Sequence, residues 1–492
     1  MAAKTGSDRG GIKAARGAAP RATAPRATAK VAGRADPGSL KIAYIGGGSR
    51  LWARNLMLDL ALCKELSGTV SLYDIDRGSA VLNARLGAFI QSRPEAVSRW
   101  DYAVADSLEE ALTGADFVVI SIQPGSLECM AAEVAAAERH GMFFPVGDTV
   151  GATGLVRGLR AATIYEGFAH AIAERCPGAW VINYTNPMTI CTRTLTRVEP
   201  GLKVFGCCHE VFGTQRHLAR VAADALGLSA PPPRGEVAVN VLGINHFTFV
   251  DRADWRGNDL LSLLPGWIES HNATRPLSEA EVETAGDWFH DNCRVKWSLF
   301  GRWGVLPAAG DRHLVEFLPG FTRSPGELFI WGVKRTPVAW RIERWKKAPA
   351  LTEEVLAGRA PLAFDESGEE GVAQMKALLG LGDLVTNANC ENVGQVEGLP
   401  AGSVVETNLR FSRDRIDPLT AGALPPGPAA IVSRHVSNQE AIVEAALMRD
   451  RDLAFGAFYN DPANRLPPDE SWELFREMLA ASAPWLSGWR LD

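Results

Sequence analysis

The order of hydrophobic and polar positions divides the chain near residue 237. Before that point, short apolar runs typical of strands buried on both faces alternate with segments that carry one apolar helical face. The predicted strands are 42–45, 69–73, 115–122, 179–182 and 202–206, and the predicted helices include 80–92, 108–113 and 161–174. This alternation predicts an α/β fold with a doubly wound parallel sheet.

The pattern after residue 237 is different. The run VAVNVLGINHFTFVDRAD alternates in a way that predicts antiparallel strands, and tryptophan-rich helices are expected to follow as far as Trp345. Further predictions are a helix at 365–379, a turn at 389–398, a strand at 402–411 and a helix at 438–448. We therefore expect a Rossmann-type NAD-binding domain at residues 41–212 and an α+β domain at residues 213–492.

Residues 1–40 have a different composition, rich in Ala, Gly, Arg, Lys and Pro. Few apolar side chains are present to offset the entropy of ordering, so we expect a disordered basic tail that catalysis does not need. The net charge of the whole chain is -6, which argues against a general nucleic-acid binder. Because we find no signal peptide, no membrane-length apolar run and no disulfide-like spacing among the eight cysteines, we expect a cytoplasmic protein with no membrane partner.

A glycine turn joins the first predicted strand to a helix. In the sequence GGGS, Gly46 and Gly48 let the backbone approach a pyrophosphate, and N–H groups from Ser49 onward can bind its negative charge. Asp74 ends the second strand, 26 positions after Gly48, where an acid meets the ribose hydroxyls and favours NAD over its 2′-phosphorylated relative. Leu51 replaces the third glycine of the usual motif, so a glycine-rich turn of another α/β protein is the alternative.

Polar side chains follow three of the predicted parallel strands. Gln123 follows the strand at 115–122, the segment NYTNPM follows 179–182, and CCHE follows 202–206. Strand ends of this kind meet at one edge of an open sheet, so we expect one cleft, with Gln123 beside the cofactor. Its thiols and imidazoles suit a divalent metal, although a buried cysteine and a structural histidine are the alternative.

These segments carry a resemblance to a known family. The sequence resembles glycoside hydrolase family 4, the NAD- and manganese-dependent glycosidases whose fold is similar to an elaborated lactate/malate dehydrogenase. The matching pieces, from residue 41 to past 405, are KIAYIGGGSR, INYTNPM, GCCHEV, LGINHF, LPAAGDRHLVEFLP and NVGQVEGLP with the following VVETN. The resemblance implies that NAD takes a hydride from sugar carbon 3, that a base removes the proton on carbon 2, and that elimination and water addition follow, with Mn²⁺ as Lewis acid.

The resemblance also implies roles for individual residues. Cys208 and His246 correspond to the metal ligands, with Cys207 a packing neighbour, and His209 corresponds to the acid that assists the leaving group. Two asparagines, Asn186 and Asn245, would position sugar hydroxyls. The triplet Asp311, Arg312 and His313 would line the sugar pocket, and a surface ion pair is the alternative for that triplet.

The sequence differs from part of the family in the residue that could serve as catalytic base. Phospho-sugar members use a tyrosine, but this chain has none between Tyr184 and Tyr459. We predict that Asp287 is the base, with Asp291 as second choice and helix capping as the alternative role. In having a histidine after the metal-binding cysteine, the sequence resembles family members that act on unphosphorylated sugars.

With Glu210 after that histidine, the sequence most resembles α-glucosidases. α-Galactosidases and α-glucuronidases differ from them mainly at this position. We therefore expect an α-glucoside as the small-molecule substrate, and the family resemblance suggests a homodimer or homotetramer. An NAD-dependent dehydrogenase of a sugar or hydroxy acid, releasing NADH, is the main alternative, and a non-catalytic NAD-binding sensor is a third.

Overall fold

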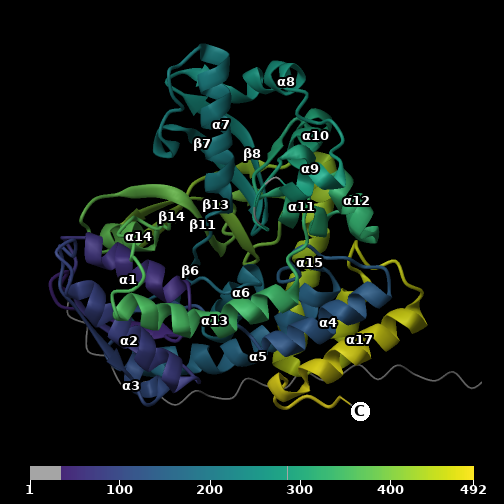
Figure 1. The fold of residues 1–492 in the computed structure, drawn as a ribbon. Helices are drawn as coiled ribbons and strands as arrows, with labels where there is room; N and C mark the ends of the chain where they lie inside the picture. Colours follow the sequence, from purple (N-terminus) through teal and green to yellow (C-terminus); the bar gives the residue numbers. More distant parts are fainter. Residues whose placement is uncertain (1–34, 285, 287, 492) are drawn as a thin grey trace, which may run out of the picture. The chain divides into compact units, whose positions relative to one another are not determined.

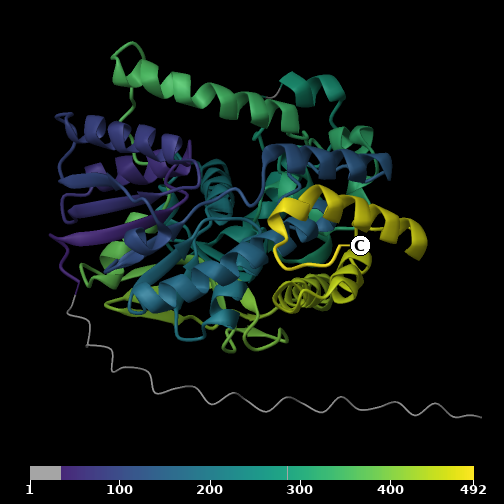
Figure 2. The same cartoon turned by 90° about the horizontal axis from the view of Figure 1, so that it is seen from below.

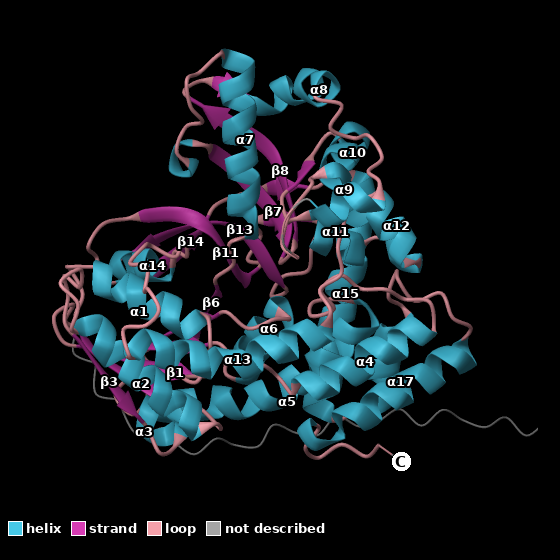
Figure 3. Cartoon of the chain, in the orientation of Figure 1, coloured by secondary structure: helices cyan, strands magenta, loops and turns pink. Residues whose placement is uncertain are grey.

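The structure, a computed structural model, describes residues 35–284, 286 and 288–491 (Figures 1 and 3). Most of the predicted tail and the predicted base Asp287 therefore lie outside the described residues. Within the described part, no helix is both long and apolar enough to cross a membrane.

A nine-stranded sheet forms the base of the fold, in the order β14-β13-β11-β6-β5-β4-β1-β2-β3. Its parallel strands are β1 (Leu40–Ile45), β2 (Gly68–Tyr73), β3 (Trp100–Val104), β4 (Phe117–Ile120), β5 (Trp180–Asn183) and β6 (Lys203–Gly206). All five strands predicted before residue 237 are present, and β3 is an additional one. The doubly wound α/β class is thereby confirmed.

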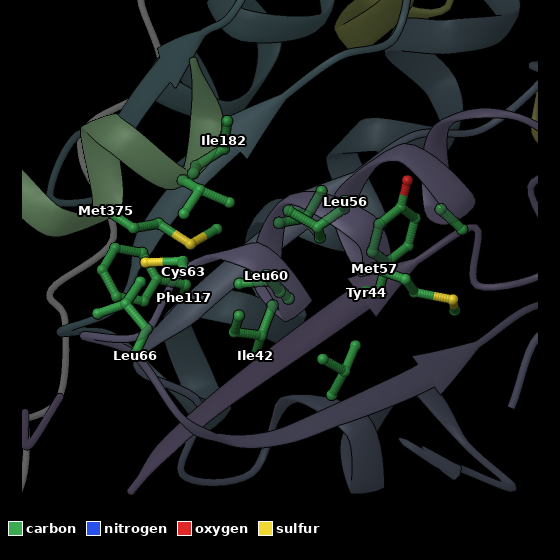
Figure 4. Packing of buried hydrophobic residues seen from close by; sticks show 14 of the residues in the cluster. Ile42, Tyr44, Leu56, Met57, Leu60, Cys63, Leu66, Phe117, Ile182 and Met375 are labelled. Atoms are coloured by element: carbon green, nitrogen blue, oxygen red, sulfur yellow. The ribbon is translucent and has the colours of Figure 1, made fainter. Parts of the chain in front are cut away.

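Helices cover both faces of this sheet: α1 (Trp52–Leu62) and α2 (Arg77–Gln91) one face, and α3 (Leu108–Leu112), α5 (Gly151–Arg175) and α6 (Met188–Val198) the other. Helix α4 (Leu127–Arg139) packs on α5, and α7 (Glu210–Leu226) packs in a separate core with later elements. Alternate residues of β1 enter two separate cores: Ile42 and Tyr44 pack with α1 (Figure 4), whereas Ala43 and Ile45 pack toward α5. Burial on both faces is the reason that the strand reads as a continuous apolar run. Helix α5 is longer than the predicted 161–174, because it begins ten residues earlier, at Gly151.

The predicted antiparallel strands are β7 (Ala238–Ile244) and β8 (Phe247–Trp255), which form a hairpin with Asn245 and His246 at its turn. Short strands β9 (Asn258–Asp259) and β10 (Leu306–Pro307) pair with β8. The helices after this hairpin are α8 (Leu260–Ser270), α9 (Glu279–Thr284), α10 (Arg294–Trp303), α11 (Asp311–Phe317), α12 (Pro325–Ile330), α13 (Val338–Leu356) and α14 (Gly371–Leu378), with a 3₁₀ turn at Phe321–Arg323. Another 3₁₀ turn, at Arg234–Glu236, precedes β7. The predicted helix 365–379 thus begins six residues late, at Gly371.

Three later strands extend the first sheet. β11 (Leu384–Glu391) pairs antiparallel with β6 through Asn389 and Gly206, and β13 (Val404–Ser412) and β14 (Arg415–Pro418) continue the sheet outward. The turn predicted at 389–398 is wrong for its first residues, which belong to β11, whereas the strand predicted at 402–411 is β13. The late strands therefore lie next to β6, where CCHE begins; the domain boundary at residue 212 stays a prediction.

The remaining elements are β12 (Val396–Glu397), β15 (Gly422–Ala423), α15 (Pro426–Met448), α16 (Arg451–Tyr459), α17 (Pro468–Ser482) and a 3₁₀ turn at Ala483–Trp485. Helix α17 packs on α4 and α5, where the buried pair Glu133–Arg160 meets Ser482. Helix α13 lies along the outside of α2 (Figure 2), and Arg85 of α2 donates to Glu353 of α13 at 2.5 and 2.9 Å.

Candidate active site

The glycine turn after β1 is packed too tightly for side chains. Gly46 has φ +91°, and a Cβ there would lie 2.1 Å from the carbonyl oxygen of Ser121. A Cβ on Gly48 would lie 2.9 Å from Asp74 Oδ2, which already accepts a 2.8 Å hydrogen bond from the N–H of Gly48. Burial raises the pKa of Asp74, and the turn N–H groups oppose that rise. The residues thus form the close backbone approach that a dinucleotide needs.

The surroundings of the turn also fit a nucleotide. Asn83 Nδ2 donates to the carbonyls of Gly47 and Ser49 at 2.7 and 2.9 Å and so holds the turn. Helix α1 starts directly after it without a side-chain cap, which leaves N–H groups of its first turn for a phosphate. Gln123, after β4, is exposed and accepts a 3.2 Å hydrogen bond from Arg157. Of the predicted cofactor residues, Gly46, Gly48, Ser49 and Asp74 are brought together, and Gln123 lies at the end of the strand beside β1.

Two predicted sugar-binding asparagines each carry a buried oxygen without a described partner. The Oδ1 atoms of Asn186 and Asn245 accept no hydrogen bond among the described residues. The Asn186 backbone carbonyl accepts from Arg157 Nε at 2.9 Å, and Asn245 Nδ2 donates to Glu406 at 3.2 Å. A buried acceptor without a donor is costly, so sugar hydroxyls would satisfy both atoms.

A group of metal-binding side chains forms at the β7–β8 turn. One ligand atom each from Asp148, His246 and His313 lies within 4.8 Å of the other two, and the imidazole centroids are 3.8 Å apart. The Thr149 hydroxyl donates to Asp148 at 2.7 Å, so Nδ1 of His246, at 2.9 Å, must donate to Thr149. His246 Nε2 then carries the lone pair, and a carboxylate with two imidazoles fits a divalent metal.

The predicted ligand Cys208 lies near this group but is not one of its three members. It is buried, and burial together with Glu406 and Glu210 raises the pKa of its thiol well above the usual value. Asn387 Nδ2 donates to the Cys208 carbonyl at 3.4 Å and to Glu406 at 2.7 Å. Burial and the two carboxylates disfavour the Cys208 thiolate, whereas a bound cation would favour it. The cysteine would therefore become a thiolate ligand only when the metal is bound.

Acidic and basic groups are interleaved around the histidines. Burial opposes ionisation of Glu210, but His313 and His246 outweigh it and hold its pKa well below the usual value. Its Oε1 lies 3.6 Å from His313 Nε2, and its Oε2 accepts from the N–H of Gly310 at 2.8 Å. Burial opposes ionisation of Asp148 as well, but His313, His246, Arg157 and Arg341 together outweigh it and lower its pKa to about 2.

His209 is held by a carboxylate from a distant loop. Its Nδ1 lies 2.8 Å from Glu369 Oε1, and its side chain is 43% exposed at the start of α7. Burial opposes protonation, but the hydrogen bond and charge of Glu369 outweigh it and raise the pKa of His209 to about 8. Trp52 of α1 lies 5.9 Å from the ring, so the predicted acid is near the helix that begins at the glycine turn.

The triplet Asp311–His313 points in three directions. Asp311 accepts from the N–H groups of Val295 and Lys296 at 2.8 and 2.9 Å and so caps α10. Arg312 donates to the Trp288 carbonyl and the Thr336 hydroxyl, and His313 faces His246. Asp311 and His313 are buried, so the surface ion pair is excluded, and sugar contact by the triplet stays a prediction.

For the base, the described residues test only the second choice. Asp291 Oδ1 accepts from the N–H groups of Cys293 and Asp311 at 2.9 and 3.3 Å, and its Oδ2 lies 3.6 Å from the buried Lys296 Nζ. These contacts hold the loop before α10, and the predicted base Asp287 lies outside the described residues.

Two acids were missing from the sequence interpretation of the site. Asp148 lies in the segment before α5, to which the sequence analysis assigns no role. Glu406 lies within the matching piece VVETN, which was noticed without a role. Burial raises the pKa of Glu406 to about 7, and the hydrogen bonds from Asn245 and Asn387 oppose the rise.

Comparisons with known proteins match nearly the whole described chain. The sequence matches Family 4 glycosyl hydrolase over residues 41–223 and the Family 4 glycosyl hydrolase C-terminal domain over residues 241–464. It is 47% identical over 454 residues to the alpha-galacturonidase of Thermoanaerobacterium saccharolyticum, covering 92% of this chain and 97% of that protein. The alpha-galacturonidase of Bacillus subtilis is 45% identical, with 89% and 97% covered.

Solved structures agree with the sequence relatives. The crystal structure of lplD from Bacillus subtilis has a TM-score of 0.84 and 45% identity, covering 89% of this chain and 99% of that one. A 6-phospho-alpha-glucosidase from gut microorganisms, in complex with NAD and Mn²⁺, has a TM-score of 0.77 at 17% identity, covers 92% of this chain and 100% of that one, and shows the fold alone. The chain belongs to family 4 of the glycosyl hydrolases.

Proposed function

We propose that this glycosidase is an NAD- and metal-dependent α-galacturonidase. The observation that carries the proposal is the set of four relatives named alpha-galacturonidase, which are 42–47% identical over 89–92% of the chain. Relatives named alpha-galactosidase or alpha-glucosidase are 24–29% identical. The proposal replaces the α-glucoside that was predicted from Glu210.

The cofactors are assigned to the two sites built above. NAD would lie on the turn Gly46–Ser49 with its ribose at Asp74, and a divalent metal such as Mn²⁺ would be held by Cys208 and His246, with Asp148 beside them. When bound, these groups supply a hydride acceptor for carbon 3 and a Lewis acid for the neighbouring oxygens. The bound NAD and Mn²⁺ of a structural neighbour support this choice.

The side chains supply positioning and proton transfer. The unpartnered Oδ1 atoms of Asn186 and Asn245 would accept from sugar hydroxyls and so orient the ring. Because Glu369 holds His209 Nδ1, the free Nε2 would donate its proton to the departing glycosidic oxygen. The proton on carbon 2 would pass to Asp287. A cytoplasmic location and a homodimer or homotetramer stay predictions.

Hydrolysis of matched p-nitrophenyl glycosides tests the substrate. The α-galacturonide, α-galactoside and α-glucoside are compared with reduced protein, with NAD and Mn²⁺ each present or omitted. We expect galacturonide turnover that requires both additives and accumulates no NADH. Preferred cleavage of the glucoside would refute the substrate assignment, and steady NADH formation without glycoside cleavage would favour the dehydrogenase.

The acid has a separate test in the leaving group. A His209→Gln variant should lose little rate on p-nitrophenyl galacturonide, whose phenolate leaves without protonation, but about 10²-fold or more on methyl galacturonide. Equal losses on both substrates would contradict the role of His209 in protonating the leaving group.

A further inference from the structure

Arg341 carries a partly buried guanidinium that forms no ion pair among the described residues. Its one described hydrogen bond runs from Nη2 to the carbonyl of Val146, at a long 3.3 Å, and its buried Nε has no partner. No carboxylate lies within 4.0 Å of it among the described residues, whereas Arg335, six positions earlier, pairs with Glu138. A guanidinium has five N–H donors in a fixed fork, so most of its binding capacity is unused.

A second guanidinium lies beside it. Arg312 also has no ion pair among the described residues, and its Nε is buried without an acceptor. Its two hydrogen bonds go to neutral oxygens, the Trp288 carbonyl and the Thr336 hydroxyl. Burial lowers the pKa of Arg312, and the charge of Arg341 lowers it further. Two neighbouring cations whose hydrogen-bond partners are neutral favour an anion between them.

The acids nearby form no ion pair with either guanidinium among the described residues. Glu316 uses one oxygen for the N–H groups of Val146 and Gly147, at 2.6 and 2.9 Å, and its other oxygen has no partner. Burial raises the pKa of Glu316 to about 8, so it is mostly a neutral acid at pH 7. Asp148 is ionised and its charge acts on both guanidiniums, but it forms no ion pair with either among the described residues and lies in the group with His246 and His313.

The position of the pair is next to the candidate active site. Arg341 contacts the loop that leads from Val146 to Asp148, and Arg312 adjoins His313 in the chain. A sugar held at the histidine group would therefore lie close to these guanidiniums.

We infer that Arg341, assisted by Arg312, binds the carboxylate on carbon 6 of the substrate and so selects a uronide over a neutral glycoside. The inference rests on the proposed function, because a galacturonide differs from a galactoside in this one group. Arg341 would act as a specificity residue, since a neutral CH₂OH cannot supply the charge that a partly buried guanidinium without an ion pair lacks.

Substrate pairs test the inference. In an Arg341→Gln variant, kcat/KM for p-nitrophenyl α-galacturonide should fall about 10- to 100-fold, as expected for a lost charge-assisted hydrogen bond. The value for the α-galactoside should stay within about threefold, and Arg341→Lys should be intermediate because it keeps the charge without the fork. Arg344→Gln, on the exposed side of the same helix, is the matched control and should leave both values unchanged.

Binding of free sugars separates this inference from the proposed function. Calorimetry should show that wild-type protein binds D-galacturonate more tightly than D-galactose, and that Arg341→Gln removes the difference. Loss of binding to both sugars, or equal kinetic losses on both glycosides, would mean a structural role and overturn the inference. If wild-type protein cleaves no galacturonide, the proposed function fails. In that case, a preference for binding galacturonate that depends on Arg341 would still support the carboxylate subsite, and the lack of such a preference would refute the subsite. Tighter binding of galactose 6-phosphate would assign the subsite to phosphate and also overturn it.

Discussion

Replacing Glu133 with alanine would leave the Arg160 guanidinium buried without its anion. The two side chains are 1% and 0% exposed, and Arg160 Nη1 is paired with Glu133 Oε1. Ser482 links them, accepting from Arg160 at 2.5 Å and donating to Glu133 at 2.6 Å, so α4, α5 and α17 meet at this pair. Removing one partner of a buried pair costs about 3–5 kcal/mol, and we expect Glu133→Ala to lose stability in that range.

The assay is urea unfolding followed by fluorescence, with the slope of the transition compared between variants. The double variant Glu133→Leu/Arg160→Met removes both charges and keeps much of the volume, so it should lose less than Glu133→Ala alone. A loss below about 1 kcal/mol in the single variant, or a double variant as unstable as the single one, would refute the argument from uncompensated charge.

Two other changes have clear expected outcomes. Gly48→Ala places a Cβ against Asp74 and should weaken NAD binding at least about tenfold by calorimetry. The control is Gly167→Ala, exposed on α5 with open space around it, which should leave NAD affinity unchanged and add about 0.5–1 kcal/mol of stability. Equal NAD affinities of the Gly48→Ala variant and the wild type would contradict the packed turn. Burial raises the pKa of Glu316 from 4.5 to about 8, so the folded protein holds a proton there that the unfolded chain releases, and stability should fall as pH rises between these values by up to about 1.4 kcal/mol per unit. Glu316→Gln should lose that dependence, and parallel stability curves for variant and wild type would exclude the effect.

The parallel strands could be predicted because they are buried on both faces. All four residues of β4 are buried and apolar, which leaves no polar position to obscure the run. β11 was not predicted as a strand, because it carries Asn387 and Asn389 at buried positions. Their polarity reflects contacts beside Cys208 and β6, not exposure to water. A prediction that places every polar residue at the surface therefore fails for strands that carry buried polar residues near a site.

The site was predictable where its residues adjoin a strand end. Cys208, His209 and the Asn245–His246 turn follow apolar runs and could be found from the sequence. Asp148 and Glu406 could not be assigned, because their roles depend on residues that only the folded chain brings near them. Arg341 gave no signal at all, since a charged residue near the start of a helix usually faces water.

The pairing of β11 with β6 has a consequence for how the protein is made. Asn389 emerges from the ribosome about 180 residues after Gly206, which at 5–20 residues per second is roughly 10–40 s later. During that interval β6 presents an open hydrogen-bonding edge at the side of an already translated sheet, the kind of edge that recruits other chains. Productive synthesis therefore depends on protecting this edge until the late strands arrive, and truncated chains that end before residue 384 should aggregate rather than accumulate as a folded nucleotide-binding half.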